Sequence, residues 1–381
     1  MDKRTRVGVI FGGRSGEHEV SLMSARSVME AIDRDKYDVV CLGIDKEGRW
    51  ITQGDPMQQL TEGSAGDIQE LPGASAQPAL VGDTRRELVP GTQQSGFPQV
   101  DVVFPVLHGP FGEDGTLQGL LELADLPYVG AGVTGSAVGM DKAVFKAVMR
   151  GHGLPIVDYI LIRRGEWEAT PDVTLDRVEA ALGYPIFTKP ANLGSSVGIC
   201  RCSDREQLAA GLAEAALYDR RLLAEAAVPA AREIELSVLG NDDPIVSVPG
   251  EVIPSRDFYS YESKYIDTGD RASELLIPAP LPRDTFLRVQ DLAARAYRAI
   301  DCAGMARADF LLSGTTGELY VNELNTIPGF TAISMYPKLW EASGIPYTEL
   351  IDRLIQLALD RYGDKKRSLS SYVSLESAGK D

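Results

Sequence analysis

Four polar residues flank two apolar runs in the stretch RADFLLSGTTGELYVNELN, residues 307–325. Both runs are typical of β-strands, and the Ser, Gly and Thr residues between them are typical of a turn. Since side chains at positions i and i+2 lie on one face of a strand, a hairpin would bring Asp309, Glu323 and Asn325 together beside the arginine. Three oxygen-bearing groups suit a hard divalent cation such as Mg²⁺. The alternative is a salt bridge between Arg307 and one carboxylate on an exposed sheet face.

A second candidate site is the segment FTKPANLGSSVGIC, residues 187–200, which we interpret as a strand, a glycine-rich loop and a second strand. Small residues let backbone N–H groups approach a phosphate closely, and Lys189 supplies a positive charge at the base of the loop. The chain contains no GxxxxGK[ST] loop and no GxGxxG after its first strand, which weakens a P-loop or a dinucleotide-binding interpretation. The segment also fits a plain hairpin.

Three further segments have residues suited to ligand binding. His108 follows a predicted strand, at the end where ligands bind in open α/β sheets, although a lone histidine is more often structural. Glu17 precedes a predicted helix and could favour its dipole or face a ligand ammonium group. The aromatic stretch FYSYESKYIDTGD, residues 258–270, has no clear period and is typical of a lid loop.

Composition limits the classes of function. The 381 residues suit two or three domains, and 44% hydrophobic with 24% charged residues is ordinary for a globular enzyme. A net charge of −17 argues against nucleic acid or an anionic membrane as the main partner. No run approaches ~18 apolar residues and no signal peptide is evident, so we expect a cytoplasmic protein. Four cysteines without a CxxC pair favour reduced thiols over a zinc site.

The elements that must position these residues alternate between strand and helix. Near the N-terminus, RVGVIF, a helical pattern, DVVCLGI and VDVVFPVL give a strand–helix–strand order, which predicts a doubly wound α/β domain. Residues 54–99 are rich in Gly, Gln, Ser and Pro and are expected to form an irregular surface insertion. The polar C-terminal tail is expected to be mobile.

Six motifs together resemble the D-alanine–D-alanine ligases, a family of the ATP-grasp superfamily: GGRSGEHEVSLMSA, HGPFGEDGTLQG, GSAVGMDK, KPANLGSSVGI, FYSYESKY and RADF…NELNTIPGFTAISMYP. They occur in the family's order from about residue 7 to residue 362. The resemblance implies an N-terminal α/β domain at 1–138, ATP-grasp domains at 139–228 and 229–365, and a flexible tail at 366–381.

The resemblance also implies a reaction. ATP phosphorylates the carboxylate of one D-alanine, and the amine of a second D-alanine attacks the acyl phosphate. D-Alanyl-D-alanine, ADP and phosphate are released, and the dipeptide is used in peptidoglycan. The implied partners are these small molecules and a second copy of the chain in a homodimer.

Several residues match metal and nucleotide positions of the family. Asp309, Glu323 and Asn325 match the residues that bind two Mg²⁺ ions, for which Mn²⁺ can substitute, and Arg307 matches a residue that contacts the reacting carboxylate and the phosphoryl group. This arrangement meets a physical need, because phosphoryl transfer is catalysed mainly by positioning and charge neutralisation. The implied nucleotide contacts are Lys142, Lys189 and Ser196 at the phosphates, Glu225 and Phe258 at adenine, and Glu233 at ribose. The segment AVPAARE between the two glutamates departs from the commoner family spelling.

Other residues match D-alanine positions of the family. Glu17 matches the residue that holds the ammonium of the first D-alanine, and Ser195 and Tyr265 match hydroxyls that hydrogen-bond with it and join the lid to the N-terminal domain. The remaining implied contacts are His108 beside the first carboxylate, Lys264 at the phosphate, Ser334 at the second carboxylate, and the N–H of Gly329, which forms the oxyanion hole with Arg307.

Three alternatives remain open from the sequence. A different ATP-grasp ligase would share the hairpin but lack the set Glu17, Ser195 and Tyr265. A D-alanine–D-lactate ligase would have a differently spelled lid. A non-catalytic nucleotide-binding protein would have lost one of the three metal-binding residues, and all three are present.

The hairpin interpretation predicts that Glu323 is essential. Glu323→Gln keeps the size of the side chain and removes its charge, so ATP turnover is expected to fall at least ~100-fold, as when one charge-stabilising group is lost. Phosphate release at saturating Mg²⁺ measures the effect. Near-normal turnover would exclude this hairpin as the metal site.

Overall fold

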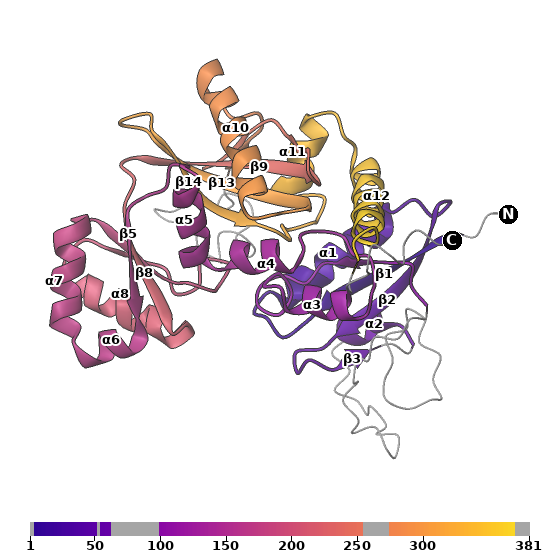
Figure 1. Cartoon of the computed structure of the whole chain (residues 1–381), viewed down its shortest axis with the longest axis horizontal. Helices are drawn as coiled ribbons and strands as arrows, with labels where there is room; N and C mark the ends of the chain where they lie inside the picture. The colour runs from indigo at the N-terminus through magenta and orange to yellow at the C-terminus, as the bar shows by residue number, and fades with distance from the viewer. Residues whose placement is uncertain (1–3, 52–53, 62–98, 254–273, 370–381) are drawn as a thin grey trace, which may run out of the picture.

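The computed structural model describes residues 4–51, 54–61, 99–253 and 274–369. Its strands form three separate sheets, and Figure 1 shows them as three lobes that follow one another along the chain. The mixed α/β class expected from the sequence is confirmed.

The first sheet has the order β3-β2-β1-β4, and β1 runs parallel to both of its neighbours. The sheet and the helices near it confirm the strand–helix–strand prediction. Their bounds are β1 (Thr5–Gly12), α1 (His18–Ala31), β2 (Tyr37–Ile44), β3 (Trp50–Ile51), α2 (Pro56–Thr61), β4 (Val102–Pro105) and α3 (Thr116–Leu123).

Helix α2 corrects the expectation of an irregular segment at 54–99, because the first part of this segment is helical. The Asp55 carboxylate accepts hydrogen bonds from two backbone N–H groups of the first turn, at 2.9 and 3.1 Å, and a proline occupies the first helical position. Met57 and Leu60 then pack against the core of the first lobe. The Asp-Pro pair is typical of a helix start, but the composition of the segment suggested irregular structure. The remainder of the segment, from residue 62 to 98, lies outside the described residues.

The second sheet has the order β5-β8-β6-β7, with every neighbouring pair antiparallel. The predicted strand–loop–strand segment is confirmed as β6, the glycine-rich loop and β7. The elements of this part of the chain are α4 (Val133–Met140), α5 (Lys142–Gly151), β5 (Tyr159–Arg163), α6 (Arg164–Ala169), α7 (Pro171–Leu182), β6 (Ile186–Pro190), β7 (Cys200–Cys202), α8 (Arg205–Tyr218) and β8 (Arg221–Ala226).

The third sheet has the order β12-β11-β9-β13-β14, and the short β10 also pairs with β9. Strand β13 lies between β9 and β14 and is antiparallel to both, which confirms the predicted hairpin. The elements are β9 (Ala231–Gly240), β10 (Ile245–Val246), β11 (Gly250–Ile253), β12 (Glu274–Leu276), α10 (Arg283–Ala299), β13 (Gly304–Ser313), β14 (Leu319–Asn325), α11 (Met335–Ala342) and α12 (Tyr347–Lys365).

The last helix, α12, returns to the first lobe. Its fully buried apolar residues belong to the same core cluster as Val7 and Val9 of β1 and Val102 of β4: Leu350, Ile351, Leu354 and Ile355. Figure 1 shows this yellow helix lying against the indigo N-terminal part of the chain. No helix in the described part of the chain is long and apolar enough to cross a membrane.

This packing predicts that α12 stabilises the first lobe. Leu354→Ala removes a fully buried side chain, so the free energy of unfolding is expected to fall by about 2–5 kcal/mol. Arg353→Ala, an exposed position on the same helix, is the control and should change it by less than about 0.5 kcal/mol. Chemical denaturation of both variants measures the difference, and equal effects would contradict the packing role.

Candidate active site

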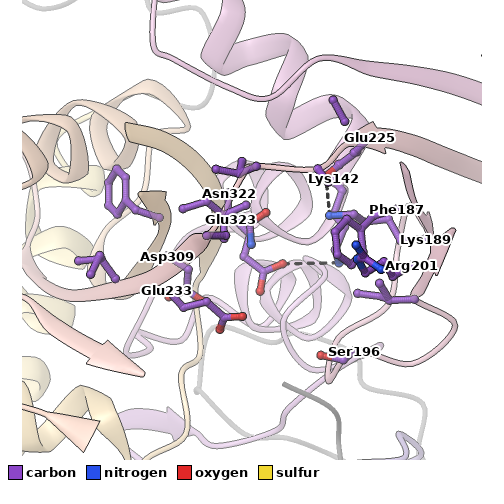
Figure 2. A pocket seen from close by; sticks show the side chains of 18 of the residues that line it. Lys142, Phe187, Lys189, Ser196, Arg201, Glu225, Glu233, Asp309, Asn322 and Glu323 are labelled. Carbon is purple, nitrogen blue, oxygen red and sulfur yellow. Dashed lines mark ion pairs between the residues drawn. The ribbon is translucent and has the colours of Figure 1, made fainter. Parts of the chain in front are cut away.

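A cavity of about 480 Å³ lies between the second and third sheets. Strands β6, β7 and β8 with the glycine-rich loop supply one wall, and β9, β13 and β14 supply the other. The volume falls in the range of small-molecule sites. Figure 2 shows charged side chains from both walls directed into this space.

One face of the β13–β14 pair carries the polar residues of the hairpin. Arg307 lies opposite Asn325, and Asp309 lies opposite Glu323. Residues directly opposite in an antiparallel pair share a face, so the four side chains are neighbours, as predicted. After Asp309 the register shifts, which leaves Asn322 as an extra residue in β14. Such a bulge redirects side chains, and Asn322 also lines the cavity.

Arg307 is held by two carboxylates. Its Nε and Nη2 donate to the two oxygens of Asp309, both at 2.7 Å, and Nε lies 3.1 Å from Oε2 of Glu235. Burial alone would lower the pKa of Arg307, but Asp309 and Glu235 keep it well above its usual value. Sequence reasoning missed Glu235, which lies on β9 directly opposite Asp309. The salt bridge left open from the sequence is therefore present, but it is buried in the cavity.

The residues on this face also fit a divalent cation. Among the residues that the structure describes, no group of three His, Cys, Asp or Glu side chains forms a closed metal site, and the four cysteines are free thiols. Mg²⁺ does not need such a cage, because one or two carboxylates with water and phosphate complete its octahedron. Asp309 and Glu323 face each other and Asn325 adds an amide oxygen.

Helix α5 begins at Lys142, whose side chain lines the cavity. The carboxylate of Asp141 caps the helix by accepting hydrogen bonds from the N–H groups of Ala143 and Val144, at 3.1 and 3.0 Å. The other oxygen of Asp141 pairs with Arg221 at the start of β8. The cap therefore fixes the first residue of α5 against the second sheet.

Lys142 links the glycine-rich loop to the acidic face of the β13–β14 hairpin. Its Nζ donates to the carbonyl oxygen of Leu193 at 2.6 Å and lies 3.8 Å from Oε2 of Glu323. Burial lowers the pKa of Lys142 from its ordinary value, and Glu323 partly opposes this shift. In the loop, Ser195 and Ser196 have φ angles of 53° and 59°, which non-glycine residues rarely adopt. Such backbone strain is typical of ligand-binding loops.

Lys189 and Glu225 form a buried pair at the back of the cavity. The Nζ of Lys189 lies 2.6 Å from Oε2 of Glu225, and the Nζ of Lys146 lies 3.2 Å from the other oxygen. Burial would raise the pKa of Glu225, but Lys146 and Lys189 keep it below its usual value. Sequence reasoning missed Lys146, which follows Lys142 by one helical turn. The adenine contact expected for Glu225 stays a prediction, since lysines face both of its oxygens.

The lining of the cavity also has apolar residues. Phe187 of β6, also missed from the sequence, lines it together with Ile199, and Glu233 of β9 lies on the opposite wall. Three residues of the predicted site lie outside the described residues: Phe258, Lys264 and Tyr265.

The glycine-rich loop also contacts the first lobe. The hydroxyl of Ser195 donates a hydrogen bond to Oε1 of Glu17, which precedes α1. This confirms the predicted contact between the two residues. The contact brings the first lobe to the part of the glycine-rich loop that lines the cavity.

His108 is buried and uses both ring nitrogens. Nδ1 lies 2.9 Å from the carbonyl oxygen of Ile327, so it carries the proton, and Nε2 accepts from the hydroxyl of Ser24 at 2.9 Å. Burial lowers the pKa of His108, which favours the neutral ring. The histidine thus joins the first sheet to the loop after β14, and its predicted contact with a substrate carboxylate stays a prediction.

Gly329 and Ser334 are neighbours at the start of α11. A Cβ atom on Gly329 would lie 3.1 Å from Oγ of Ser334, which is the residue that precedes the helix. The hydroxyls of Ser334 and Thr331 lie 2.8 Å apart. A helix N-terminus attracts anions, so this loop suits a carboxylate.

Known proteins resemble the chain over nearly its whole length. Residues 6–131 match the family described as "D-ala D-ala ligase N-terminus", and residues 148–356 match "D-ala D-ala ligase C-terminus". The D-alanine–D-alanine ligase of Heliobacterium modesticaldum is 49% identical, with 97% of this chain and 98% of the relative covered.

Solved structures agree with these sequence matches. The structure of the D-alanine-D-alanine ligase from Coxiella burnetii has a TM-score of 0.79 and 36% identity, with 96% of each chain covered. The VanG D-Ala:D-Ser ligase from Enterococcus faecalis has a TM-score of 0.78 and 32% identity, with 93% of this chain and 100% of that chain covered. The fold is therefore shared with ligases that differ in their second amino acid.

The buried carboxyl group of Glu113 is expected to make the free energy of unfolding depend on pH. Burial first, and then the Glu17 carboxylate, raise the pKa of Glu113 from 4.5 to about 8. Because the folded protein holds the proton of Glu113 more tightly than the unfolded chain, this group contributes to the free energy of unfolding fully below pH 4.5. The contribution is lost as the pH rises to about 8. Over this window, without metal or nucleotide, the free energy of unfolding should fall more steeply in the wild type than in Glu113→Gln, by at most about 1.4 kcal/mol per pH unit.

Denaturant titrations across this pH window test the prediction. Glu349→Gln, which removes an exposed carboxylate, is the control and should keep the wild-type slope. Parallel curves for the wild type and Glu113→Gln would show that Glu113 does not titrate in this window.

Proposed function

Because the chain belongs to the D-alanine–D-alanine ligase family, we propose that its two D-alanines are joined in the cavity between the second and third sheets. The protein is an ATP-dependent, ADP-forming ligase that makes D-alanyl-D-alanine for peptidoglycan. The observation that supports this location is that two walls with different chemistry face each other across the cavity. The acidic and amide face of the β13–β14 hairpin lies across the cavity from a lysine-bearing, glycine-rich loop.

The first chemical step needs positive charge around the phosphates. A carboxylate oxygen of the first D-alanine attacks the γ-phosphorus, the bond to the ADP oxygen breaks, and an acyl phosphate forms. Lys142 and Lys189 would neutralise the phosphates, with Ser196 of the loop beside them, and Arg307 would neutralise the attacking carboxylate. Each of these cations is held by a carboxylate in the structure, so binding the substrates exchanges one anion for another.

The position of the first D-alanine follows from Glu17. Its carboxylate would hold the substrate ammonium, and the hydrogen bond from Ser195 fixes the carboxylate while joining the loop to the first lobe. His108, buried nearby and neutral, would position this part of the site. Closing the loop onto the first lobe would also exclude water, which would otherwise hydrolyse the acyl phosphate.

The second step requires an oxyanion site. The neutral amine of the second D-alanine attacks the acyl carbon. The tetrahedral intermediate then collapses to the amide as its bond to the phosphate oxygen breaks, and the departing phosphate takes the proton that the nitrogen loses. The N–H of Gly329 and the guanidinium of Arg307 would stabilise the oxyanion, and Ser334 at the start of α11 would receive the second carboxylate. Lys264 and Tyr265 of the proposed lid lie outside the described residues.

The proposed metal ligands are Asp309, Glu323 and Asn325. Bound Mg²⁺, or Mn²⁺ in its place, would neutralise phosphate charge and orient the nucleotide. The support is the shared face of the two carboxylates and the amide, which gives hard oxygen donors without closing the coordination sphere. For the other end of the nucleotide, we propose Glu233 at ribose and Glu225 and Phe258 at adenine.

We also propose the organisation of the whole chain. The domains are 1–138, 139–228 and 229–365, followed by a tail at 366–381, and the protein is a cytoplasmic homodimer. Sedimentation velocity tests the dimer, because a monomer at micromolar concentration would contradict it. Limited proteolysis followed by mass spectrometry tests the domain boundaries, and cell fractionation tests the location.

Product analysis tests the proposed function. The full chain with ATP and Mg²⁺ is given D-alanine, L-alanine, D-serine with D-alanine, or D-lactate with D-alanine, and released phosphate and products are measured. D-Alanine alone is expected to give one phosphate per dipeptide, and L-alanine none. With D-lactate at neutral pH we expect little or no depsipeptide. Phosphate release that does not depend on D-alanine, or a dominant mixed product, would contradict the assignment.

A further inference from the structure

Lys146 is a buried charged residue for which the proposed reaction has no role. It lies on α5, one turn after Lys142, and its side chain is completely buried. It does not line the cavity, whereas Lys142, Lys189 and Glu225 do. A ligand in the cavity can therefore contact these three residues but not Lys146, so Lys146 can act on a ligand only through a neighbour or through the field of its charge.

The neighbour is Glu225. The Nζ of Lys146 lies 3.2 Å from Oε1 of Glu225 and 6.0 Å from the centre of the Tyr159 ring, which lies on the strand next to Glu225. The other oxygen of Glu225 lies 2.6 Å from Nζ of Lys189, a pair that Figure 2 shows at the cavity wall. One carboxylate is thus shared by two lysines, only one of which reaches the cavity.

The second lysine on Glu225 becomes important when Lys189 leaves this carboxylate for a phosphate. If Lys189 turns towards a nucleotide phosphate, its contact with Glu225 weakens, and a buried carboxylate without a partner is strongly unfavourable. Lys146 does not line the cavity, so its contact with Glu225 need not change when Lys189 turns, and the carboxylate stays paired. Without Lys146, Glu225 would have Lys189 as its counter-ion and would hold it away from the phosphate.

We propose that Lys146 is a positioning residue for the nucleotide: it keeps the Glu225 carboxylate paired and so releases Lys189 to bind phosphate. The proposal rests on the proposed role of Lys189 in the ATP site. It differs from a purely structural ion pair, which would contribute to folding without changing the affinity for nucleotide.

Calorimetric titration of the full-length protein with ADP and Mg²⁺ tests the proposal. Lys146→Met keeps an unbranched side chain and removes the charge, and its Kd for ADP is expected to rise about tenfold or more, which corresponds to about 1.4 kcal/mol. Lys146→Arg keeps the charge and should bind ADP within about threefold of the wild type. In steady state, Lys146→Met should raise the KM for ATP and leave the KM for D-alanine unchanged.

A double variant separates positioning from structure. In Lys146→Met/Glu225→Gln the competing charge is gone, and the amide oxygen can still accept a hydrogen bond from adenine, so ADP should bind more tightly than to Lys146→Met alone. Arg150→Met, an exposed change on the same helix, is the matched control and should bind ADP like the wild type. Thermal unfolding of each variant establishes that it is folded.

Three results would overturn the proposal. These are an unchanged Kd in folded Lys146→Met, a double variant that binds no more tightly than Lys146→Met, or equal rises in the KM of ATP and D-alanine. If Lys146→Met does not fold, Glu225→Gln is compared with the double variant. Their affinities should agree within about threefold, because Lys146 acts through the carboxylate, and a tenfold difference contradicts this. A wild type that does not bind ADP would instead refute the proposed nucleotide site.

Discussion

Charges buried between the second and third sheets must be paired in the absence of a ligand, and this requirement determines how the side chains of the site are arranged. Three cation–carboxylate pairs share this arrangement: Arg307–Asp309, Lys189–Glu225 and Lys142–Glu323. Each cation is held in place by an anion that belongs to the protein. In the proposed reaction, phosphates and carboxylates of the substrates would replace these anions at the three cations. Each displaced carboxylate would then need another partner, as Glu225 has in Lys146. Binding would then be an exchange of partners within a site whose charges are already in place.

The pairing depends on the register of one strand. Because β13 lies between β9 and β14, Asp309 has Glu235 on one side and Glu323 on the other. A shift of one residue would turn the polar face into the core of the third lobe, so the buried apolar residues of β13, among them Phe310 and Leu312, fix the position of the charges. Packing on one face of the sheet thus determines the electrostatics on the other.

The sequence predicted the hairpin and the glycine-rich loop, since strand periodicity and turn residues are local signals. It did not predict Glu235, because the alternation of β9 shows which residues share a face but not that β9 pairs with β13. Lys146 was missed for a related reason, since helical spacing cannot show which lysine is covered by the second sheet. Helix α2 was not predicted because its segment has the composition of irregular structure, although an Asp-Pro pair precedes the helix. Pairing between distant segments is the information that a single sequence lacks.

The core shared by β1 and α12 has a consequence for the order in which the protein can fold during synthesis. Strand β1 leaves the ribosome long before α12, the helix that completes its apolar core and ends at Lys365. Through most of translation the first lobe therefore has an uncovered apolar face. A nascent chain must keep this face from aggregating until α12 emerges. A chain terminated before α12 keeps the apolar face exposed, which is a feature by which chaperones and proteases can recognise it.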